Sequence, residues 1–322
     1  MEKLLRLLAD RELHSGEEIG RLLNISRAAV WKKIKNLQAL GLQLDVIRGK
    51  GYRLASGVEL LDSTTICNAL DKTVLNNTVL HTCLITESTN DLICTLANRS
   101  FSNKIQFCTA EHQTRGRGRR ARQWSNPFGG AICLSALWCL GEGTASLEGL
   151  SLAVGLGVLQ ALTSCGATEL GLKWPNDILW QGRKLAGVLL EVHGDPTGDC
   201  QVVIGIGVNI KLTDKQLATI DQPAVDLATV CGQNISRNRA ISAIINALYH
   251  ILEGYKVKGF SMFRDQWCQH DIAVGQEVTL DASEKKVRGR ALGISEGGGI
   301  ILETDKGCRV FHGGEISLRI GG

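Results

Sequence analysis

Very short turns between apolar segments are the feature that most restricts the fold of this chain. Strands are expected at 79–85, 106–110, 131–138, 169–173, 178–180, 185–192 and 202–210. Only Gln181-Gly182 separates two of these strands, and only residues 195–198 separate two others. Because a parallel crossover needs a dozen or more residues, such neighbours must run antiparallel. The middle of the chain therefore predicts an antiparallel or mixed sheet and disfavours a regular βαβ repeat.

Helical segments complete this central unit, and a different pattern follows it. Helices are expected at 64–70, 90–98, 146–164, 237–255 and 260–269. We assign residues 62–271 to one α+β domain. Residues 272–322 contain only short strands, expected at 277–280, 286–292, 300–304, 308–312 and 316–319. Five strands in so short a segment predict a small SH3-like β-barrel.

Residues 1–61 predict a winged helix-turn-helix, with the helix-turn-helix itself at 16–35. Three short helices are expected there, followed by a hairpin of two short strands. Ser26 is placed to cap the third helix, and Gly41 ends it. The hairpin tip at 47–51 is basic and contains two glycines, which is typical of a wing.

The outer surface of this head predicts DNA binding. Residues 1–60 hold 11 Lys or Arg against 7 Asp or Glu, and this excess of four equals the net charge of +4 of the whole chain. In the third helix Val30, Ile34 and Leu37 fall on one apolar stripe that faces the core. The expected DNA-binding residues lie on another face of this helix and at the wing tip: Ser26, Arg27, Ala28, Trp31, Lys32, Lys35, Arg48 and Lys50. A solvated helix face is the alternative, against which an exposed tryptophan argues.

Cysteine usage and one uncharged segment bear on the compartment of the protein. The eleven cysteines form no CxxC pair, and most lie in apolar stretches. They are expected to be free thiols in a reducing cytoplasm, not disulfides or zinc ligands. Residues 149–168 carry no charge but include four glycines, which favours a buried helix over a membrane span. We therefore expect a cytoplasmic protein without a membrane segment.

The densest signal is a loop at 113–124, which we call the arginine loop. Five arginines fall within residues 115–122. Charge alone favours a solvated or nucleic-acid-binding loop. The interleaved Gly116 and Gly118 favour instead a loop whose backbone wraps an anionic ligand while guanidinium groups neutralise it. Such a loop should stay mobile until an anion orders it.

Four further motifs surround the arginine loop: Glu87-Ser88-Thr89-Asn90, Lys173-Trp174-Pro175-Asn176-Asp177, Lys184-Leu185-Ala186-Gly187 and Gly205-Ile206-Gly207-Val208-Asn209. Taken alone, Ser88 and Thr89 could be helix N-caps and Lys184 an exposed strand end. The chain lacks GxxxxGK[ST], which excludes a P-loop as its nucleotide site. No Ser/His/Asp or Cys/His constellation is visible, so a covalent enzyme intermediate is not expected.

The arginine loop and these motifs, in this order, resemble the biotin protein ligase family. With the winged head, the chain is similar to the bacterial members that are both ligase and repressor, and the similarity runs to residues 313–317. The resemblance implies a mixed-sheet catalytic domain like that of class II synthetases and a C-terminal SH3-like domain. It implies that ATP and Mg²⁺ activate biotin as biotinoyl-5′-AMP, followed by transfer to a lysine of the biotin carboxyl carrier protein of acetyl-CoA carboxylase.

The same resemblance implies a regulatory role. A homodimer promoted by biotinoyl-5′-AMP would bind operator DNA and repress the genes of biotin synthesis. The head supports this independently, because about four or five phosphate contacts per head would be marginal alone. Useful affinity should therefore require a dimer on a two-fold site, with a steep dependence on salt.

The resemblance also assigns roles to single residues. Lys184 and Arg119 are the catalytic residues, and Asp177 is the Mg²⁺ ligand. Biotin binding is assigned to Ser88, Thr89, Asn90, Gln113, Gly116, Arg117, Gly118, Arg119, Lys184, Gly187, Leu189 and Gly205. ATP and adenylate binding is assigned to Arg119, Arg122, Trp124, Asn176, Lys184 and Asn209. Neutral hydroxyl and amide groups at Ser88, Thr89 and Gln113 suit the neutral ureido ring of biotin.

The family pattern for this part of the loop is GRGRRG. This chain departs from it at one residue, because Ala121 stands where the pattern has its last glycine. If the backbone there needs a positive φ, alanine costs about 1 kcal/mol relative to glycine and weakens the ordering of the loop.

Two other functions remain open: a ligase whose head no longer regulates, and a ligand-sensing regulator without catalysis. The intact basic face of the third helix speaks against the first. The presence of Lys184, Arg119 and Asn209 speaks against the second. A lipoate ligase shares the expected architecture but should not carry this arginine loop together with the motif at 173–177.

Overall fold

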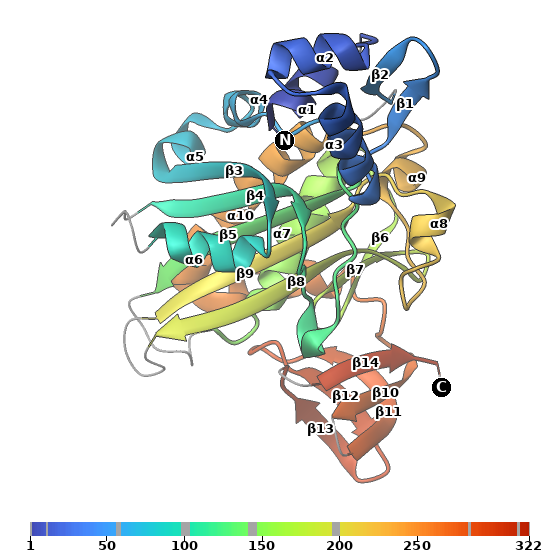
Figure 1. Cartoon of the computed structure of the whole chain (residues 1–322). Helices are drawn as coiled ribbons and strands as arrows, with labels where there is room; N and C mark the ends of the chain where they lie inside the picture. The colour runs from blue at the N-terminus through green and yellow to red at the C-terminus, as the bar shows by residue number, and fades with distance from the viewer. Residues whose placement is uncertain are drawn as a thin grey trace.

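The computed structural model describes residues 2–10, 12–55, 59–97, 104–140, 147–194, 200–282, 285–313 and 316–321. Within these residues the chain forms sheets of two, seven and five strands. The two-stranded sheet belongs to the N-terminal head and the five-stranded sheet to the C-terminal unit. These two units lie at opposite ends of the central, seven-stranded unit (Figure 1). Boundaries after residues 61 and 271 stay predictions.

The head is a winged helix-turn-helix, as expected. Its helices are α1 (Glu2–Leu8), α2 (Gly16–Leu23) and α3 (Arg27–Ala39), and its antiparallel wing is β1 (Leu44–Ile47) with β2 (Gly51–Leu54). The Ser26 hydroxyl caps α3 by accepting a hydrogen bond from the Ala29 N–H at 3.2 Å. The helix stops where Gly41 adopts φ +92°, a conformation that a side chain would strain.

The central sheet is mixed, as the turn lengths predict. Its strand order is β3-β4-β5-β9-β8-β7-β6, and of these neighbours only β3 and β4 are parallel. The strands are β3 (Thr78–Thr86), β4 (Ile105–Gln113), β5 (Ala131–Leu140), β6 (Leu170–Lys173), β7 (Asp177–Trp180), β8 (Arg183–Gly194) and β9 (Cys200–Asn209). The turn Gln181-Gly182 joins β7 to β8 as a hairpin. The turn expected at 195–198 lies outside the described residues, but β8 and β9 on either side of it are antiparallel.

Four helices lie where they are predicted: α4 (Ser63–Asn68), α6 (Thr89–Ala97), α7 (Leu150–Ser164) and α10 (Arg237–Lys258). The start predicted for α7 is wrong, because Gly149 adopts φ +75° at its N-cap and delays the helix to Leu150; Ser146 lies outside the described residues. The single helix predicted at 260–269 is also wrong. The chain there forms the 3₁₀ turn η3 (Gly259–Met262) and a short helix, α11 (Arg264–Cys268), on either side of Phe263.

Three short helices were not predicted from the sequence: α5 (Lys72–Asn77), α8 (Asp214–Leu217) and α9 (Leu227–Cys231). They have six, four and five residues. Helices of four or five residues contain little more than one turn, so α8 and α9 show little apolar periodicity. α5 is as long as the predicted α4, and length does not explain why it was missed.

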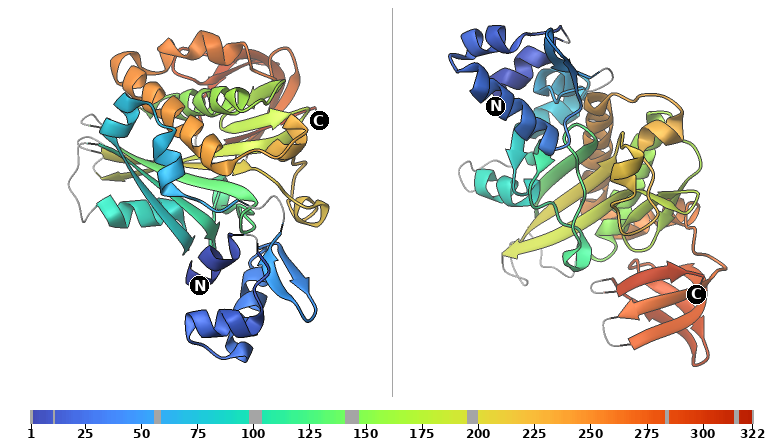
Figure 2. Two further views of the ribbon diagram at one scale, coloured as in Figure 1. Left: turned by 90° about the horizontal axis from the view of Figure 1, so that it is seen from above. Right: turned by 45° about the vertical axis from the view of Figure 1, so that its right-hand side comes forward.

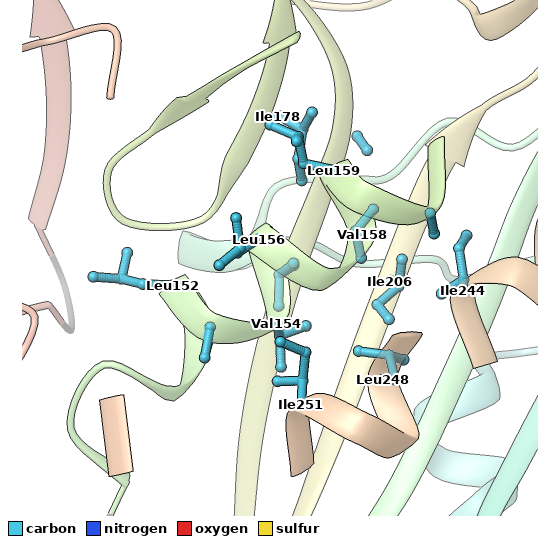
Figure 3. Close-up of a cluster of buried hydrophobic side chains, with 14 of the residues drawn as sticks. Leu152, Val154, Leu156, Val158, Leu159, Ile178, Ile206, Ile244, Leu248 and Ile251 are labelled. Carbon is cyan, nitrogen blue, oxygen red and sulfur yellow. The ribbon is translucent and has the colours of Figure 1, made fainter. Parts of the chain in front are cut away.

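Helices α7 and α10 cover one face of the central sheet and α6 covers the other (Figure 2). In Figure 3 Val154 and Val158 of α7 lie on the side of Ile206 of β9 and of Leu248 and Ile251 of α10, whereas Leu159 lies beside Ile178 of β7. A Cβ at Gly157 would lie 2.9 Å from Ile251 Cγ1, so glycine permits the close approach of α7 and α10. The uncharged segment is therefore a buried core helix. No helix within the described ranges is long and apolar enough to cross a bilayer.

The C-terminal unit is a five-stranded antiparallel sheet in the order β13-β12-β11-β10-β14. Its strands are β10 (Glu277–Ala282), β11 (Lys285–Ile294), β12 (Ile300–Thr304), β13 (Gly307–Phe311) and β14 (Ile316–Ile320). This unit contacts the central unit through the turn that contains Gly298. Trp174 Nε1 donates to the carbonyl of Gly298 at 3.0 Å, and a Cβ at Gly298 would lie only 2.7 Å from Gly149 Cα.

A buried ion pair fastens the chain segment that leaves the head. Arg237 Nη2 lies 2.5 Å from Glu111 Oε2, and the two side chains are 2% and 1% exposed. The Leu61 N–H donates to the other oxygen of Glu111 at 2.5 Å, and Arg237 also donates to the carbonyl of Glu59. Removing one partner of such a pair leaves a buried charge uncompensated at a cost of about 3–5 kcal/mol. The start of the central unit is therefore firmly positioned.

Candidate active site

Strand alternation gives the two faces of the central sheet different surfaces. In β9, Ile204 and Ile206 belong to the core beneath α7 and α10, so Gly205 and Gly207 face the opposite side. Gly207 pairs with Gly187 of the neighbouring strand β8. Because glycines occupy these positions, the middle of the second face is hollow.

A cavity of about 1110 Å³ opens on this hollowed face. Its walls come from all three units, and they include residues 39–41 at the end of α3 and residues 317–319 of β14. Most residues assigned from the family resemblance line it: Ser88, Thr89, Asn90, Gln113, Arg117, Gly118, Arg119, Arg122, Trp124, Asn176, Asp177, Lys184, Gly187, Leu189, Gly205 and Asn209. Gly116 lies just behind the lining, where a Cβ would be 3.0 Å from Gln113 Nε2. The fold thus gathers motifs that are far apart in the chain around one space.

Gly205 and Gly207 of β9 form the floor of the cavity, and each leaves room for a particular side chain. A Cβ at Gly205 would lie 2.7 Å from Asn90 Oδ1, and one at Gly207 would lie 2.3 Å from Trp124 Cε2. Neither contact could be relieved without moving the polar or aromatic group. Any side chain at these positions would therefore displace the residues that form the cavity wall.

One end of the cavity is neutral and rich in hydrogen-bonding groups. Gln113 Oε1 accepts from the Thr89 N–H at 2.7 Å and from the Thr89 hydroxyl at 2.9 Å. Ser135 Oγ lies 2.7 Å from Thr89 Oγ1 and is fully buried. Ser88 is also buried, so these hydroxyls and amides form a rigid polar corner. Such a corner suits a neutral ligand with both donors and acceptors.

The other end is charged. Lys184 Nζ lies 2.6 Å from Asp177 Oδ1, and the two side chains are 17% and 16% exposed. The contact is one of charge and not an aligned hydrogen bond. Asn209 positions the lysine from behind, since its Nδ2 donates to the carbonyls of Val225 at 3.1 Å and Lys184 at 3.4 Å. Burial lowers the pKa of Lys173; the nearby Asp177 carboxylate opposes this effect and Lys184 adds to it. An anion could therefore be held here by desolvated cations.

The arginine loop closes over the cavity with its side chains already bonded to the protein. Arg119 donates to Asn176 Oδ1 at 3.0 Å and to the carbonyl of Ile316 in β14 at 2.9 Å. It therefore ties the loop both to the motif at 173–177 and to the C-terminal unit. Trp124 lies against Gly207, and Lys184 Nζ is 5.7 Å from the centre of its ring. The Trp124 indole thus presents an aromatic surface beside the charged end.

The backbone of the arginine loop has a positive φ at Ala121, the condition under which alanine is strained relative to glycine. Ala121 adopts φ +55°, and Arg120 before it adopts φ +57°. Both lie in the left-handed region, where glycine is favoured and alanine is strained by about 1 kcal/mol. The alanine therefore disfavours the closed conformation of the C-terminal half of the arginine loop.

The residues assigned to DNA form an exposed surface on the head. Ser26, Arg27, Ala28, Trp31, Lys32, Lys35, Arg48 and Lys50 are all exposed, whereas Val30, Ile34 and Leu37 are buried. Trp31 is 56% exposed, and Lys35 Nζ lies 5.9 Å from the centre of its ring. Ser26 Oγ is engaged as the helix cap. DNA contact by these residues stays a prediction.

Several residues at the site were missed from the sequence. Ser135 and Glu191 face the cavity side from β5 and β8, and Asp91 lies in the first turn of α6. Arg319 of β14 reaches the cavity from the C-terminal unit. Strand alternation from Gly205 and Leu189 could have indicated Ser135 and Glu191, but nothing local to Asp91 or Arg319 marks them. Gly314 and Glu315 of the C-terminal motif lie outside the described residues.

Three sequence families match the three units in chain order. The HTH domain family matches residues 1–53 and the Biotin/lipoate A/B protein ligase family matches residues 82–209. The Biotin protein ligase C terminal domain matches residues 273–319. The likeness therefore covers the head, the central sheet and the C-terminal unit.

Whole proteins with the same organisation are similar to this chain. The bifunctional ligase/repressor BirA of Escherichia coli (strain K12) is 36% identical over 317 residues, which cover 98% of this chain and 96% of that protein. BirA of Bacillus subtilis (strain 168) is 28% identical over 96% of this chain and 95% of its own length. The structure of the biotin protein ligase from Aquifex aeolicus in complex with biotin and ATP matches with a TM-score of 0.64 at 28% identity, covering 76% of this chain and 99% of that one.

Proposed function

Because this chain belongs to the biotin protein ligase family, with the winged head of its bifunctional ligase/repressor members, we propose that its cavity forms biotinoyl-5′-AMP and passes the biotinoyl group to a protein lysine. The chain is both a biotin ligase and a transcriptional repressor. One observation supports the assignment of the site above all. A neutral polar corner at Thr89 and Gln113 and a cation at Lys184 lie in the same cavity.

In the proposed first step, the polar corner binds the ureido ring and the acyl chain extends over the glycine floor towards Lys184. A carboxylate oxygen of biotin attacks the α-phosphorus of ATP, and pyrophosphate leaves. Two anions must approach each other, so the Lys184 ammonium offsets their repulsion. Lys184 exchanges its present partner Asp177 for the substrates. Arg119 retains the adenylate, and positioning supplies the rest of the acceleration.

Mg²⁺ is the proposed cofactor. No group of three or more His, Cys, Asp or Glu side chains in the described part of the chain could hold a metal ion alone. Mg²⁺ nevertheless suits this site, because it is commonly held by one or two carboxylates together with substrate phosphates and water. Asp177 Oδ1 fits that donor set, since it is buried and makes no hydrogen bond. The ion would neutralise charge on the phosphates.

In the second step, the acceptor lysine arrives deprotonated and its nitrogen attacks the acyl carbon of the mixed anhydride. An amide bond forms and AMP leaves, so no covalent enzyme intermediate is needed. The proposed acceptor is the biotin carboxyl carrier protein, and we propose the cytoplasm as the compartment of the reaction. Closure of the arginine loop protects the anhydride from water until the lysine enters.

For repression, we propose a homodimer that pairs the free edge of β8. β7 pairs with β8 only as far as Gly187, whereas β8 continues to Gly194. Beyond Gly187 no strand within the described ranges covers that edge, and Val192 on it is 44% exposed. An uncovered strand edge is a ready template for pairing with a second copy. Such a dimer would place two heads on one two-fold operator.

The contact between head and body supports coupling of the ligand to DNA binding. The Phe128 N–H donates to the carbonyl of Leu40 at 3.0 Å, and the Phe128 ring is buried in the core of the head. Pro127 lies so close to Gly41 that a Cβ there would be 2.9 Å from Pro127 Cβ. Because only Ser125 and Asn126 separate the arginine loop from Pro127 and Phe128, ordering of the loop would restrain the end of α3.

A single preparation tests both activities. The full chain is incubated with ATP, labelled biotin and a carrier domain, with and without EDTA, and the same sample is then titrated with operator DNA. We expect ATP-dependent labelling of the carrier that EDTA abolishes, and tighter operator binding when biotin and ATP are present. Arg119→Gly should release the adenylate faster than the parent. Unlabelled carrier would contradict the ligase site, and operator binding that ignores biotin and ATP would contradict the coupling.

Replacement of Ala121 by glycine is expected to slow release of biotinoyl-5′-AMP by about fivefold, because it removes about 1 kcal/mol of left-handed strain from the closed loop. Stopped-flow dissociation of the adenylate measures the effect. Ala218→Gly is the matched control, since Ala218 is exposed and has φ −66°, where glycine brings no relief. Release from Ala121→Gly at the parent rate or faster would show that the alanine does not limit closure.

A further inference from the structure

Arg117 lies in the N-terminal half, or front, of the arginine loop. Its guanidinium is held between two carboxylates. Nη1 and Nη2 donate to Asp91 Oδ2 and Oδ1 at 2.7 and 2.6 Å. Nε and Nη2 donate to Glu191 Oε1 and Oε2 at 2.9 and 3.1 Å. One planar guanidinium thus makes two paired contacts, the geometry in which arginine binds carboxylates most firmly. The hydrogen bonds from Arg117 lower the pKa of Asp91, so this carboxylate stays charged.

The three residues come from separate elements. Asp91 lies in the first turn of α6, Glu191 lies on β8, and Arg117 belongs to the loop that crosses above them. The Glu191 side chain is 24% exposed and that of Arg117 is 35% exposed, whereas Asp91 is 57% exposed, so the Glu191 half of the contact is the part shielded from solvent. Such a contact adds a side-chain anchor at Arg117 to the backbone hydrogen bonds that Thr114 and Arg115 make to Thr86 and Glu87 where the loop begins.

A chain of hydrogen bonds joins this contact to the polar corner. Glu191 Oε2 accepts from Asn90 Nδ2 at 2.6 Å, and Ser135 Oγ lies 2.5 Å from Asn90 Oδ1. The same Ser135 oxygen lies 2.7 Å from Thr89 Oγ1, whose partner is Gln113. Ser135 has one proton for these two neighbours. The groups that face the ligand are therefore linked to the groups that hold the loop.

We propose that Asp91 and Glu191 are positioning residues that hold the front of the arginine loop closed before any ligand binds. Arg117 then serves the ligand through the position of its backbone, because its guanidinium is committed to the two carboxylates. The resemblance assigns Arg117 to biotin binding, and this view restricts that assignment to its backbone. The inference rests on the proposed function only in taking biotin as the ligand that this loop covers.

Trypsin tests the inference without any ligand, because the loop carries five arginines that the protease can cut. The full, unliganded chain is digested briefly, and cleavage within 115–122 is followed by mass spectrometry. Asp91→Asn, Glu191→Gln and the double variant each remove charge while keeping side-chain shape. We expect cleavage in the loop to rise by about tenfold in the double variant, since local opening exposes the cleavage sites.

Ligand kinetics provide the second readout. In Asp91→Asn and Glu191→Gln the KM for biotin should rise by about fivefold, while kcat and the KM for ATP stay within twofold of the parent, because a preset loop lowers only the cost of ordering on binding. Asp91→Glu should restore the parent KM, since it returns the charge.

Glu87→Gln is the matched control. Glu87 pairs with Arg115 of the same loop at 3.2 Å, but the two side chains are 65% and 77% exposed, so little stabilisation is expected from this pair. Its cleavage pattern and KM values should equal those of the parent.

Three outcomes would overturn the inference. Cleavage of the double variant at the parent rate would mean that the two carboxylates do not hold the loop. Cleavage spread over the whole chain would mean that they stabilise the domain and do not act on the loop. An unchanged KM for biotin would remove the link to the ligand. If the parent itself bound no biotin, the proposed function would fail while the digestion would still test the positioning role.

Discussion

Replacing Lys184 by glutamine is expected to slow formation of biotinoyl-5′-AMP by about 100- to 1000-fold, the loss typical for one preorganised charge-stabilising group. The Lys184 side chain is only 17% exposed, so its charge is little screened by solvent. Glutamine keeps much of the side-chain length but cannot offset the repulsion between carboxylate and α-phosphate. Single-turnover formation of the adenylate from labelled ATP measures this step apart from transfer.

Two further variants separate chemistry from stability. Lys184→Gln leaves Asp177 without its ion-pair partner, so part of any damage could come from an unpaired carboxylate. In the double variant Lys184→Gln, Asp177→Asn we expect thermal stability to recover; only stability is read from this variant, because Asp177 is also the proposed Mg²⁺ ligand. Lys72→Gln removes an exposed lysine on α5 and should leave the rate unchanged. Adenylate formation by Lys184→Gln within threefold of the parent would show that this lysine does not act on the reaction.

Replacing Arg27 and Lys35 of α3 by alanine is expected to weaken operator binding by about 100- to 1000-fold at physiological salt. Each head would lose two cationic contacts, so a dimer would lose four. Because every neutralised phosphate contributes about −0.9 to the slope of log K against log salt, the slope should become less steep by about 3 to 4 units. Fluorescence anisotropy with labelled operator at several salt concentrations measures both quantities.

The same variant should keep full ligase activity, because both side chains are exposed and neither lines the cavity. Lys286→Ala with Arg288→Ala is the matched control. These residues are exposed on β11, in the unit at the opposite end of the molecule (Figure 1), and their loss should change operator affinity by less than about twofold. An unaltered salt slope in the head variant would mean that α3 does not contact the phosphates.

Much of the fold follows from local sequence, because local geometry decides it. The turn Gln181-Gly182 is too short for anything but a hairpin, and the mixed sheet follows from such turns. Ser26 and Gly41 mark the two ends of α3 because capping and a positive φ are local requirements. The errors occur where tertiary packing decides instead, as at Phe263, where the predicted helix is broken.

The candidate site follows from the sequence only in part. The motifs identify Thr89, Gln113 and Lys184, because each lies in a recognisable run of residues. That they surround one cavity depends on strand order, since β9 lies between β5 and β8 and brings distant motifs side by side. We could not predict the order of the strands from local sequence patterns, because hydrogen bonds between strands join segments that are far apart in the chain.

Turn lengths, caps and strand patterns thus predicted from the sequence alone a winged head on a mixed sheet, and the ordered motifs predicted a ligase through their resemblance to the biotin protein ligase family. Only the tertiary structure decided which charges meet. It paired Lys184 with Asp177 and Arg117 with Asp91 and Glu191, and it set the Phe128 ring in the core of the head. The physical reason is that periodicity, capping and turn geometry act between neighbours in the chain, whereas desolvation and ion pairing act between neighbours in space.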